Sequence, residues 1–234
     1  MGKAQKKRKT GECVYCGKHG PVTDDHIPPK NLFPKPRPHN LVTVPSCYPC
    51  NEGASKDDEY FRLCLAILEN AKGHPARDSI LPSVLRSLSR RKATGLSEAF
   101  WSSTVYAERI SPAGLYLGTG ILLSISLERL DRVAIRIIKG LLFHETRRRL
   151  PDDYVVRPLH ISRIPELDSE VRQAVEDFIY AMMEKEPERI GDVFAFSRLW
   201  SPAGWPRSVW LLGFYGEGEY YCQIGPREVE AIML

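Results

Sequence analysis

The sequence predicts an α+β protein built from a small N-terminal module and a larger second domain. Three observations predict it: two Cys-x-x-Cys pairs fall within the first 50 residues, β-branched segments alternate with helix-periodic ones, and 234 residues with 43% hydrophobic composition can bury a core. We divide the chain into a basic disordered arm (1–10), a cysteine-paired module (11–72), a helical linker (73–95) and an α+β domain (96–234).

The basic excess lies at one end of the chain. Residues 1–40 hold nine Lys or Arg against three Asp or Glu, a local charge of +6, whereas the rest holds 24 against 26. Such a segment is typical of proteins that meet phosphates, although a solvated tail explains the stretch KAQKKRK equally well. No apolar run approaches the roughly 20 residues of a membrane span. The lysine-rich start is not followed by the apolar segment that a signal peptide needs. We therefore expect a soluble, cytoplasmic protein of bacterial or phage type that does not bind membranes.

Four of the six cysteines form two pairs with metal-ligand spacing. Cys13-x-x-Cys16 and Cys47-x-x-Cys50 each let two sulfurs reach one ion, and four thiolates match tetrahedral Zn²⁺. Two unrelated thiol pairs or reducible disulfides are the alternative, which the paired spacing disfavours. We predict a structural zinc site, because four thiolates leave no coordination position open for water.

The elements of the first module are expected in the order strand, loop, strand, helix. PVTDDHIPP (21–29) is a short extended segment, NLFPKPRPHN (31–40) is a proline-rich loop, and LVTVPS (41–46) is a second strand. A helix is predicted to begin near Cys50 and to end before Gly73, and a short linker helix follows at 81–91.

The second domain is expected to hold an antiparallel sheet with two main helices. The turn sequence SPAG at 111–114 predicts a hairpin. The strongest apolar stripe predicts a long helix over 126–149, and a second amphipathic helix is expected over 169–185. Four further strands are predicted, at 153–162, 193–200, 208–216 and 219–225.

Asp25, His26, Asn40 and Asn51 lie between or just after the cysteine pairs. Around them, the stretches CVYCG, DDHIPP, HNLVTVP and CYPCN occur in the order in which the HNH endonucleases carry them, and the first quarter of the chain resembles that family. The resemblance implies an N-terminal ββα-metal (HNH) module with structural zinc.

By this resemblance, His26 is the general base, Asp25 and Asn51 bind one catalytic metal, and Asn40 positions His26. The chemistry is consistent with these roles, because neutral imidazole suits the deprotonation of water near pH 7 and a divalent cation stabilises charge on the phosphate. Adjacent residues of a strand point to opposite sides, so Asp25 can face the metal while His26 faces the water.

Two further features bear on the metal and the substrate. Ser55 and Lys56 stand where many family members carry another His or Asn, which leaves few protein ligands and favours Mg²⁺ or Mn²⁺, ions that keep several waters. In the proline-rich loop, Lys30, Lys35 and Arg37 are candidate phosphate contacts, with an ordinary solvated loop as the equal alternative.

The sequence thus predicts a metal-dependent endonuclease that hydrolyses phosphodiester bonds in DNA. The alternative is a zinc-knuckle nucleic-acid-binding protein whose nuclease site has decayed, although a binder needs only the cysteines and the basic arm. The second domain carries no recognisable catalytic constellation. We expect it to supply target choice or self-association, such as a homodimer, and its aromatic cluster to form sheet core with one exposed face: Trp200, Trp205, Trp210, Phe214, Tyr215, Tyr220 and Tyr221.

Overall fold

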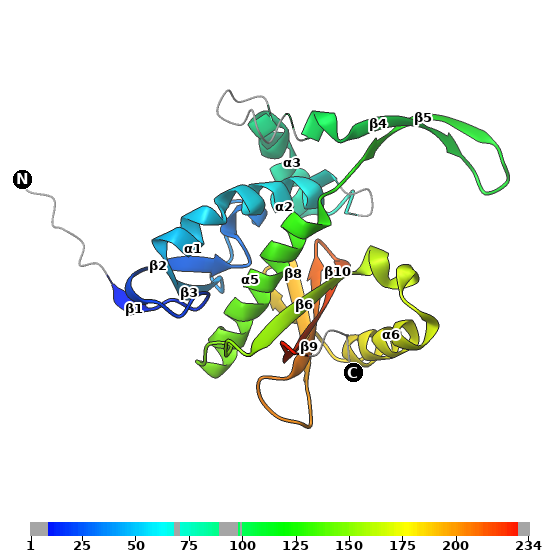
Figure 1. Ribbon diagram of the computed structural model, residues 1–234. Helices are drawn as coiled ribbons and strands as arrows, with labels where there is room; N and C mark the ends of the chain where they lie inside the picture. Colours follow the sequence, from blue (N-terminus) through cyan, green and yellow to red (C-terminus); the bar gives the residue numbers. More distant parts are fainter. Residues whose placement is uncertain (1–8, 68–70, 89–97, 99, 229–234) are drawn as a thin grey trace, which may run out of the picture.

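The computed structural model describes residues 9–67, 71–88, 98 and 100–228. Within them the protein is α+β, as the sequence predicts, and all the strand pairs are antiparallel (Figure 1). Residues 1–8 of the predicted basic arm lie outside the described residues, and so do residues 89–95 of the predicted linker. No helix in the described part of the chain is long and apolar enough to cross a membrane.

The first sheet has three strands, β1 (Thr10–Glu12), β2 (His19–Ile27) and β3 (Val42–Cys47), in the order β1-β2-β3. Strands β2 and β3 pair as a hairpin that places Asp25 opposite Val44 and His26 opposite Thr43. Both the predicted extended segment and the predicted second strand are therefore confirmed. The proline-rich loop between them begins with a short 3-10 helix, η1 (Lys30–Leu32).

The predicted helix after the second cysteine pair is divided in two, so its expected continuity is wrong. Helix α1 (Tyr48–Gly53) begins two residues earlier than predicted, with Pro49 in its first turn, where the missing N–H of proline does no harm. A turn at Ala54 separates it from α2 (Ser55–Ile67). The next helix is α3 (Pro75–Leu88), which begins six residues before the predicted linker helix. Near their C-terminal ends, both predicted helices include residues that lie outside the described part of the chain, 68–70 in the first and 89–91 in the second.

The second sheet has five strands in the order β6-β10-β9-β8-β7. Its strands match the four predicted ones, with β7 added at one edge. The strands are β6 (Tyr154–His160), β7 (Glu188–Ile190), β8 (Phe194–Trp200), β9 (Ser208–Phe214) and β10 (Glu217–Pro226).

Helices cover both faces of this sheet. Successive side chains of a strand point to opposite faces, so each face can present its own apolar side chains to a helix. Trp210 and Leu212 of β9 join the main core with α5 (Leu127–Thr146), whereas Leu211 belongs to a second cluster with Val175 of α6 (Ser169–Met183). The two predicted helices therefore lie on opposite faces. A 3-10 helix, η3 (Ile161–Glu166), connects β6 to α6.

Helix α5 also packs against the first sheet, so one hydrophobic core continues across both parts of the chain. Ile27 of β2 and Ile137 of α5 belong to the same buried cluster as Trp210 of β9. The contact is close at Gly140 of α5, where an added Cβ would lie 2.5 Å from Cγ1 of Ile27. The core therefore extends beyond the predicted boundaries at residues 72 and 96.

Strands β4 (Thr104–Ile110) and β5 (Tyr116–Leu123) form a separate two-stranded hairpin that extends away from the rest of the molecule (Figure 1). We call it the projecting hairpin. Its turn is the predicted SPAG sequence, closed by a hydrogen bond from the Gly114 N–H to the Ser111 carbonyl.

Most of the aromatic cluster of the second domain is core, as predicted, but α6 packs on the sheet face that was expected to be exposed. Trp210, Phe214, Tyr215, Tyr220 and Tyr221 are all buried. The remaining two, Trp200 and Trp205, are exposed and partly buried respectively, and Trp205 lies under the guanidinium of Arg148 at 3.5 Å.

Candidate functional site

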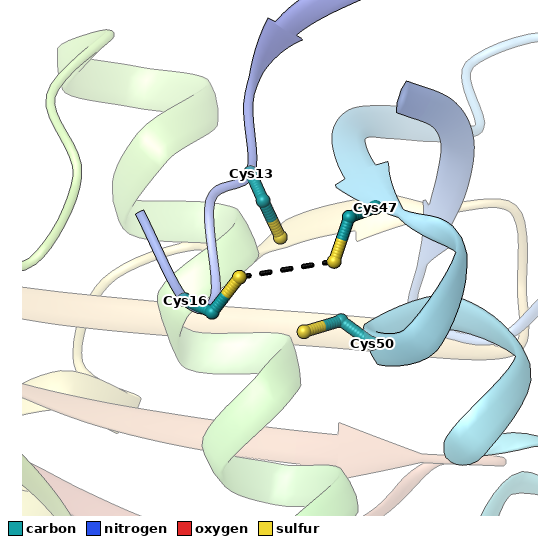
Figure 2. A group of neighbouring side chains, drawn as sticks. All are labelled: Cys13, Cys16, Cys47 and Cys50. Carbon is teal, nitrogen blue, oxygen red and sulfur yellow. Dashed lines mark hydrogen bonds between the residues drawn. The ribbon is translucent and has the colours of Figure 1, made fainter. Parts of the chain in front are cut away.

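The four paired cysteines converge on one point between the first sheet and α1. Cys13 and Cys16 lie on the turn between β1 and β2, whereas Cys47 and Cys50 lie at the start of α1 (Figure 2). Their sulfur atoms all lie within 4.8 Å of one another, and Sγ of Cys16 is 3.7 Å from Sγ of Cys47. Four sulfurs held tetrahedrally at about 2.3 Å from Zn²⁺ would be about 3.8 Å apart. The cluster could therefore hold a metal ion such as zinc.

Backbone geometry holds this cluster in place. The Gly17 N–H donates to the Cys13 carbonyl (2.9 Å), and Gly17 takes the left-handed φ of 72° that glycine tolerates best. Burial raises the pKa of the Cys13 thiol, but backbone N–H groups of Cys47, Cys16 and Tyr15 more than offset this and lower it to about 6. Cys13 is therefore the thiol that ionises most readily, whereas burial and the neighbouring thiols raise the pKa of Cys50.

Two cations, Lys139 of α5 and Arg149 just after the helix, lie near the cysteine cluster. A Cβ added to Gly17 would lie 3.0 Å from Cζ of Arg149. The pKa of Lys139 is lowered, first by burial and then by Arg149 and Arg227, while Cys50 acts in the opposite direction. Four thiolates on one Zn²⁺ carry a net charge of −2, which these cations partly offset.

His26 lies on β2, half-buried, with the proline-rich loop beside it. Burial lowers the pKa of His26 from its ordinary value of 6.5, Lys30 and Arg37 lower it further, and Asp25 acts in the opposite direction. The imidazole is therefore neutral at pH 7, as a general base must be. The neighbouring Asp24 is exposed and pairs with Lys9 at 2.8 Å.

Asp25 is buried and already has ionic and hydrogen-bonding partners. Its Oδ2 accepts a hydrogen bond from the Tyr15 hydroxyl (2.7 Å) and another from Nη2 of Arg136 in α5 (2.7 Å). The residue is only 6% exposed. Burial, with the Asp25 charge adding to it, strongly raises the pKa of Tyr15, so that hydroxyl stays a donor.

The Arg136 guanidinium bridges two carboxylates. Nη1 of Arg136 lies 2.7 Å from Oδ1 of Asp58 in α2, while its Nη2 contacts Asp25. Burial raises the pKa of Asp58 to about 6, against the opposing effect of Arg136 and with a further increase from Asp25. A cation is thus already present where Asp25 would be expected to meet a metal.

Arg136 belongs to a row of arginines along one side of α5. Arg129 and Arg132 both contact Asp57 of α2, at 2.8 and 2.7 Å. Their spacing, i, i+3 and i+7, brings the three guanidinium groups to the same side of a helix. Sequence reasoning missed these partners, although the spacing of the arginines and the adjacent acids Asp57 and Asp58 were a usable signal.

The two predicted asparagines are both engaged. Asn51 donates from Nδ2 to the Thr23 hydroxyl (2.9 Å). Thr23 and Asp25 are two residues apart on β2 and point to the same side of the strand, so Asn51 lies on the side that carries Asp25. Asn40 donates from Nδ2 to the carbonyl of Arg189 in β7 (3.0 Å). That contact does not involve the strand of His26, so the predicted orienting role of Asn40 depends on the family resemblance alone.

The proline-rich loop that carries the predicted phosphate contacts is attached to the second sheet. The buried Tyr215 hydroxyl donates to the Leu32 carbonyl (2.8 Å). Lys30, Lys35 and Arg37 are all exposed on this loop, and Nε of Arg37 donates to the Lys30 carbonyl (3.2 Å). The structure therefore keeps these three cations open to solvent, with Lys30 and Arg37 near enough to His26 to affect its pKa.

Two hollows of about 410 and 440 Å³ lie on the second sheet, and none of the predicted site residues lines them. Comparison with known protein families, with curated proteins and with solved structures found no match to this chain. The functional argument therefore depends on the residues and geometry described above.

Proposed function

We propose that the protein is an endonuclease of the HNH type that hydrolyses phosphodiester bonds in DNA, with His26 as the general base. The observation that carries this proposal is the surroundings of His26. The imidazole is half-buried and has a lowered pKa, and the exposed cations Lys30 and Arg37 act on it electrostatically. A neutral base next to two cations is suited to a water molecule attacking a phosphate.

In this mechanism the zinc site would be structural. The cysteine cluster ties the turn before β2 to the start of α1, which fixes the β2–β3 hairpin between them. His26 would accept a proton from water, while Lys30 and Arg37, with Lys35, would bind the phosphate backbone. Asn40 would act on His26 only indirectly, through the loop that it fastens to β7.

The catalytic metal is the part of the family pattern that these residues fit least well. A hydrated Mg²⁺ or Mn²⁺ needs accessible carboxylate oxygen, but Asp25 is buried and its Oδ2 is held by Arg136 and Tyr15. In this arrangement Asp25 and Asn51 do not form a site for such an ion. The proposed metal requirement is therefore tested separately from the proposed base.

The same contacts favour a second candidate function, a zinc-knuckle nucleic-acid-binding protein with a decayed nuclease site. With Asp25 bound to Arg136, and Asn40 bonded to β7, two of the four family residues serve structural contacts. This candidate predicts DNA binding through the basic loop without cleavage.

Supercoiled plasmid distinguishes the two candidates. We expect the wild-type chain to nick it, and we expect His26→Ala to abolish nicking with its zinc content unchanged. Nicking by the zinc-loaded wild type with and without added Mg²⁺ or Mn²⁺ tests the metal requirement separately. His19→Ala is the matched control, since His19 is exposed on the same strand. Equal nicking by His26→Ala would refute the assigned base, and binding without any nicking would favour the second candidate.

A further inference from the structure

The projecting hairpin exposes an unusual number of apolar side chains. Seven of the twelve large apolar side chains exposed in the described part of the chain lie on it or just before it. Their exposed fractions run from 54% to 74%. They are Trp101, Val105, Tyr106, Ile110, Leu115, Tyr116 and Leu117.

Three of these side chains share one face of the hairpin. Tyr106 and Ile110 are four residues apart on β4, and Tyr116 of β5 is the direct partner of Ile110. Residues an even number apart on a strand, and residues directly opposite on paired strands, point to the same side. The exposed Glu108 lies between Tyr106 and Ile110 on the same face, and the strand pairing is irregular between Glu108 and Ile110. The result is an exposed face that carries three large apolar side chains and one carboxylate.

The position of the hairpin is fixed at its base. Phe100 packs against the main core, and the Ser124 N–H donates to the Ser103 carbonyl (2.9 Å). The Ser126 N–H donates to the Tyr60 hydroxyl in α2 (2.9 Å). The hairpin is therefore anchored at its base and extends away from the body (Figure 1), with these apolar side chains exposed.

Both outer edges of the hairpin are open to further pairing. Neither β4 nor β5 pairs with another strand among the described residues. Lysine and proline, which commonly protect exposed edges, are absent from both strands. An isolated two-stranded hairpin is also only marginally stable in water, so a partner is expected to cover it.

We infer that the projecting hairpin is a dimerisation element, and that it packs against the same hairpin of a second copy about a two-fold axis. Charge supports this occupant over nucleic acid, because Glu108 and Arg109 are the only charged residues of the two strands and phosphate binding needs several cations. A two-fold axis lets one apolar face serve as its own partner.

The exposed area sets how much of the hairpin a dimer must cover. Taking about 150–250 Å² for each aromatic side chain and somewhat less for each aliphatic one, the three side chains of the shared face present roughly 400 Å² per copy at their exposed fractions, and all seven present roughly 800 Å². A standard stable interface buries about 800 Å² per partner, so a stable dimer covers the strand edges or the second face as well. The inference does not depend on nuclease activity, so either proposal can fail without the other.

Light scattering coupled to size exclusion tests the dimer on the full chain. We expect the wild type at twice the chain mass of 26.6 kDa. The triple change Tyr106→Thr, Ile110→Thr and Tyr116→Thr keeps strand-favouring residues and should give monomer, with zinc content and far-UV circular dichroism unchanged. The control pair Tyr180→Gln and Met183→Gln removes equally exposed apolar groups from α6 and should remain dimeric.

A photo-crosslinking residue in place of Tyr106 locates the contact. Crosslinks between two copies should map to residues 104–120 of the second copy. A monomeric wild type, a dimer that survives the triple change, crosslinks confined to the partner's body, or monomers that bind phosphatidylcholine and phosphatidylglycerol vesicles through the hairpin would each overturn the inference.

Discussion

At the scale of single residues, two neighbours on one strand have opposite surroundings. His26 is half-buried beside exposed cations, whereas Asp25 is buried against a guanidinium. The alternation of a strand makes both possible one residue apart. Substitution of His26 should therefore change the proposed activity, whereas substitution of Asp25 should change the stability of the protein.

The lowered pKa of His26 predicts the acid limb of the proposed cleavage reaction. The base works in its neutral form, so the midpoint of the decline of kcat/KM at acid pH should lie below pH 6.5. Burial is the main cause and Lys30 the next, so Lys30→Ala should move the limb up toward 6.5. Lys35→Ala, an exposed lysine on the same loop, is the control. A wild-type limb above 6.5 would contradict this.

Arg136 gives a prediction about stability. Arg136→Met would leave Asp25 and Asp58 buried without their cation and should cost about 3–5 kcal/mol in the free energy of unfolding. Arg132→Met, at a more exposed pair, should cost about 1 kcal/mol or less. Urea denaturation at pH 7 measures both. Adding Asp58→Asn to Arg136→Met should recover part of the loss, and equal losses for the two single variants would argue against the bridge.

At the scale of elements, the sequence predicted most of what local periodicity controls. The hairpin at SPAG follows from its turn residues, whereas the helix with the long apolar stripe follows from helical spacing and the strands of the second sheet from their residue types. The break at Ala54 was not predicted, although Gly53 directly before it is a poor helix former and was a usable signal. It places Asp57 and Asp58 at the start of a new helix, where the N-terminal dipole favours acids.

The cysteine cluster was also predictable, since ligand spacing is a local property. Its neighbours were not. Arg136 is 111 residues from Asp25 along the chain, and Tyr215 is 183 residues from Leu32. Pairing over such separations depends on how α5 and the second sheet pack, which no single-sequence pattern specifies.

The contact between α5 and β2 can be tested at Gly140. An added Cβ would lie 2.5 Å from Cγ1 of Ile27, a β-branched side chain with little rotamer freedom, so Gly140→Ala should destabilise the protein by about 1–3 kcal/mol. At Gly53, near the end of α1, an added Cβ meets nothing within 4 Å. Gly53→Ala should therefore be neutral or stabilising, by about 0.5–1 kcal/mol. Thermal unfolding compares the two, and a stable Gly140→Ala would mean that the helix can move away from the hairpin.

At the scale of the whole molecule, one core connects the cysteine module with the five-stranded sheet. Ile27, Ile137 and Trp210 belong to one buried cluster. The cysteine module and the five-stranded sheet should therefore unfold together, and destabilising one of them should lower the stability of the other.

Zinc removal tests this coupling. All four tryptophans lie beyond residue 100, so their fluorescence reports on the second part of the chain, away from the cysteines. Chelation of the metal should lower the midpoint of thermal unfolding seen by tryptophan fluorescence, and added Zn²⁺ should restore it. A tryptophan transition that ignores the metal would show that the sheet unfolds independently.

The fastening of the proline-rich loop has a consequence for engineering and evolution. Tyr215 and the Arg189 carbonyl hold the loop from the second sheet, at Leu32 and Asn40. Mutations that accumulate in β7 or the β9–β10 turn can therefore shift the loop without altering a single residue of the first module. A chimaera that exchanges the second half of the chain would therefore inherit a new loop position together with the new half.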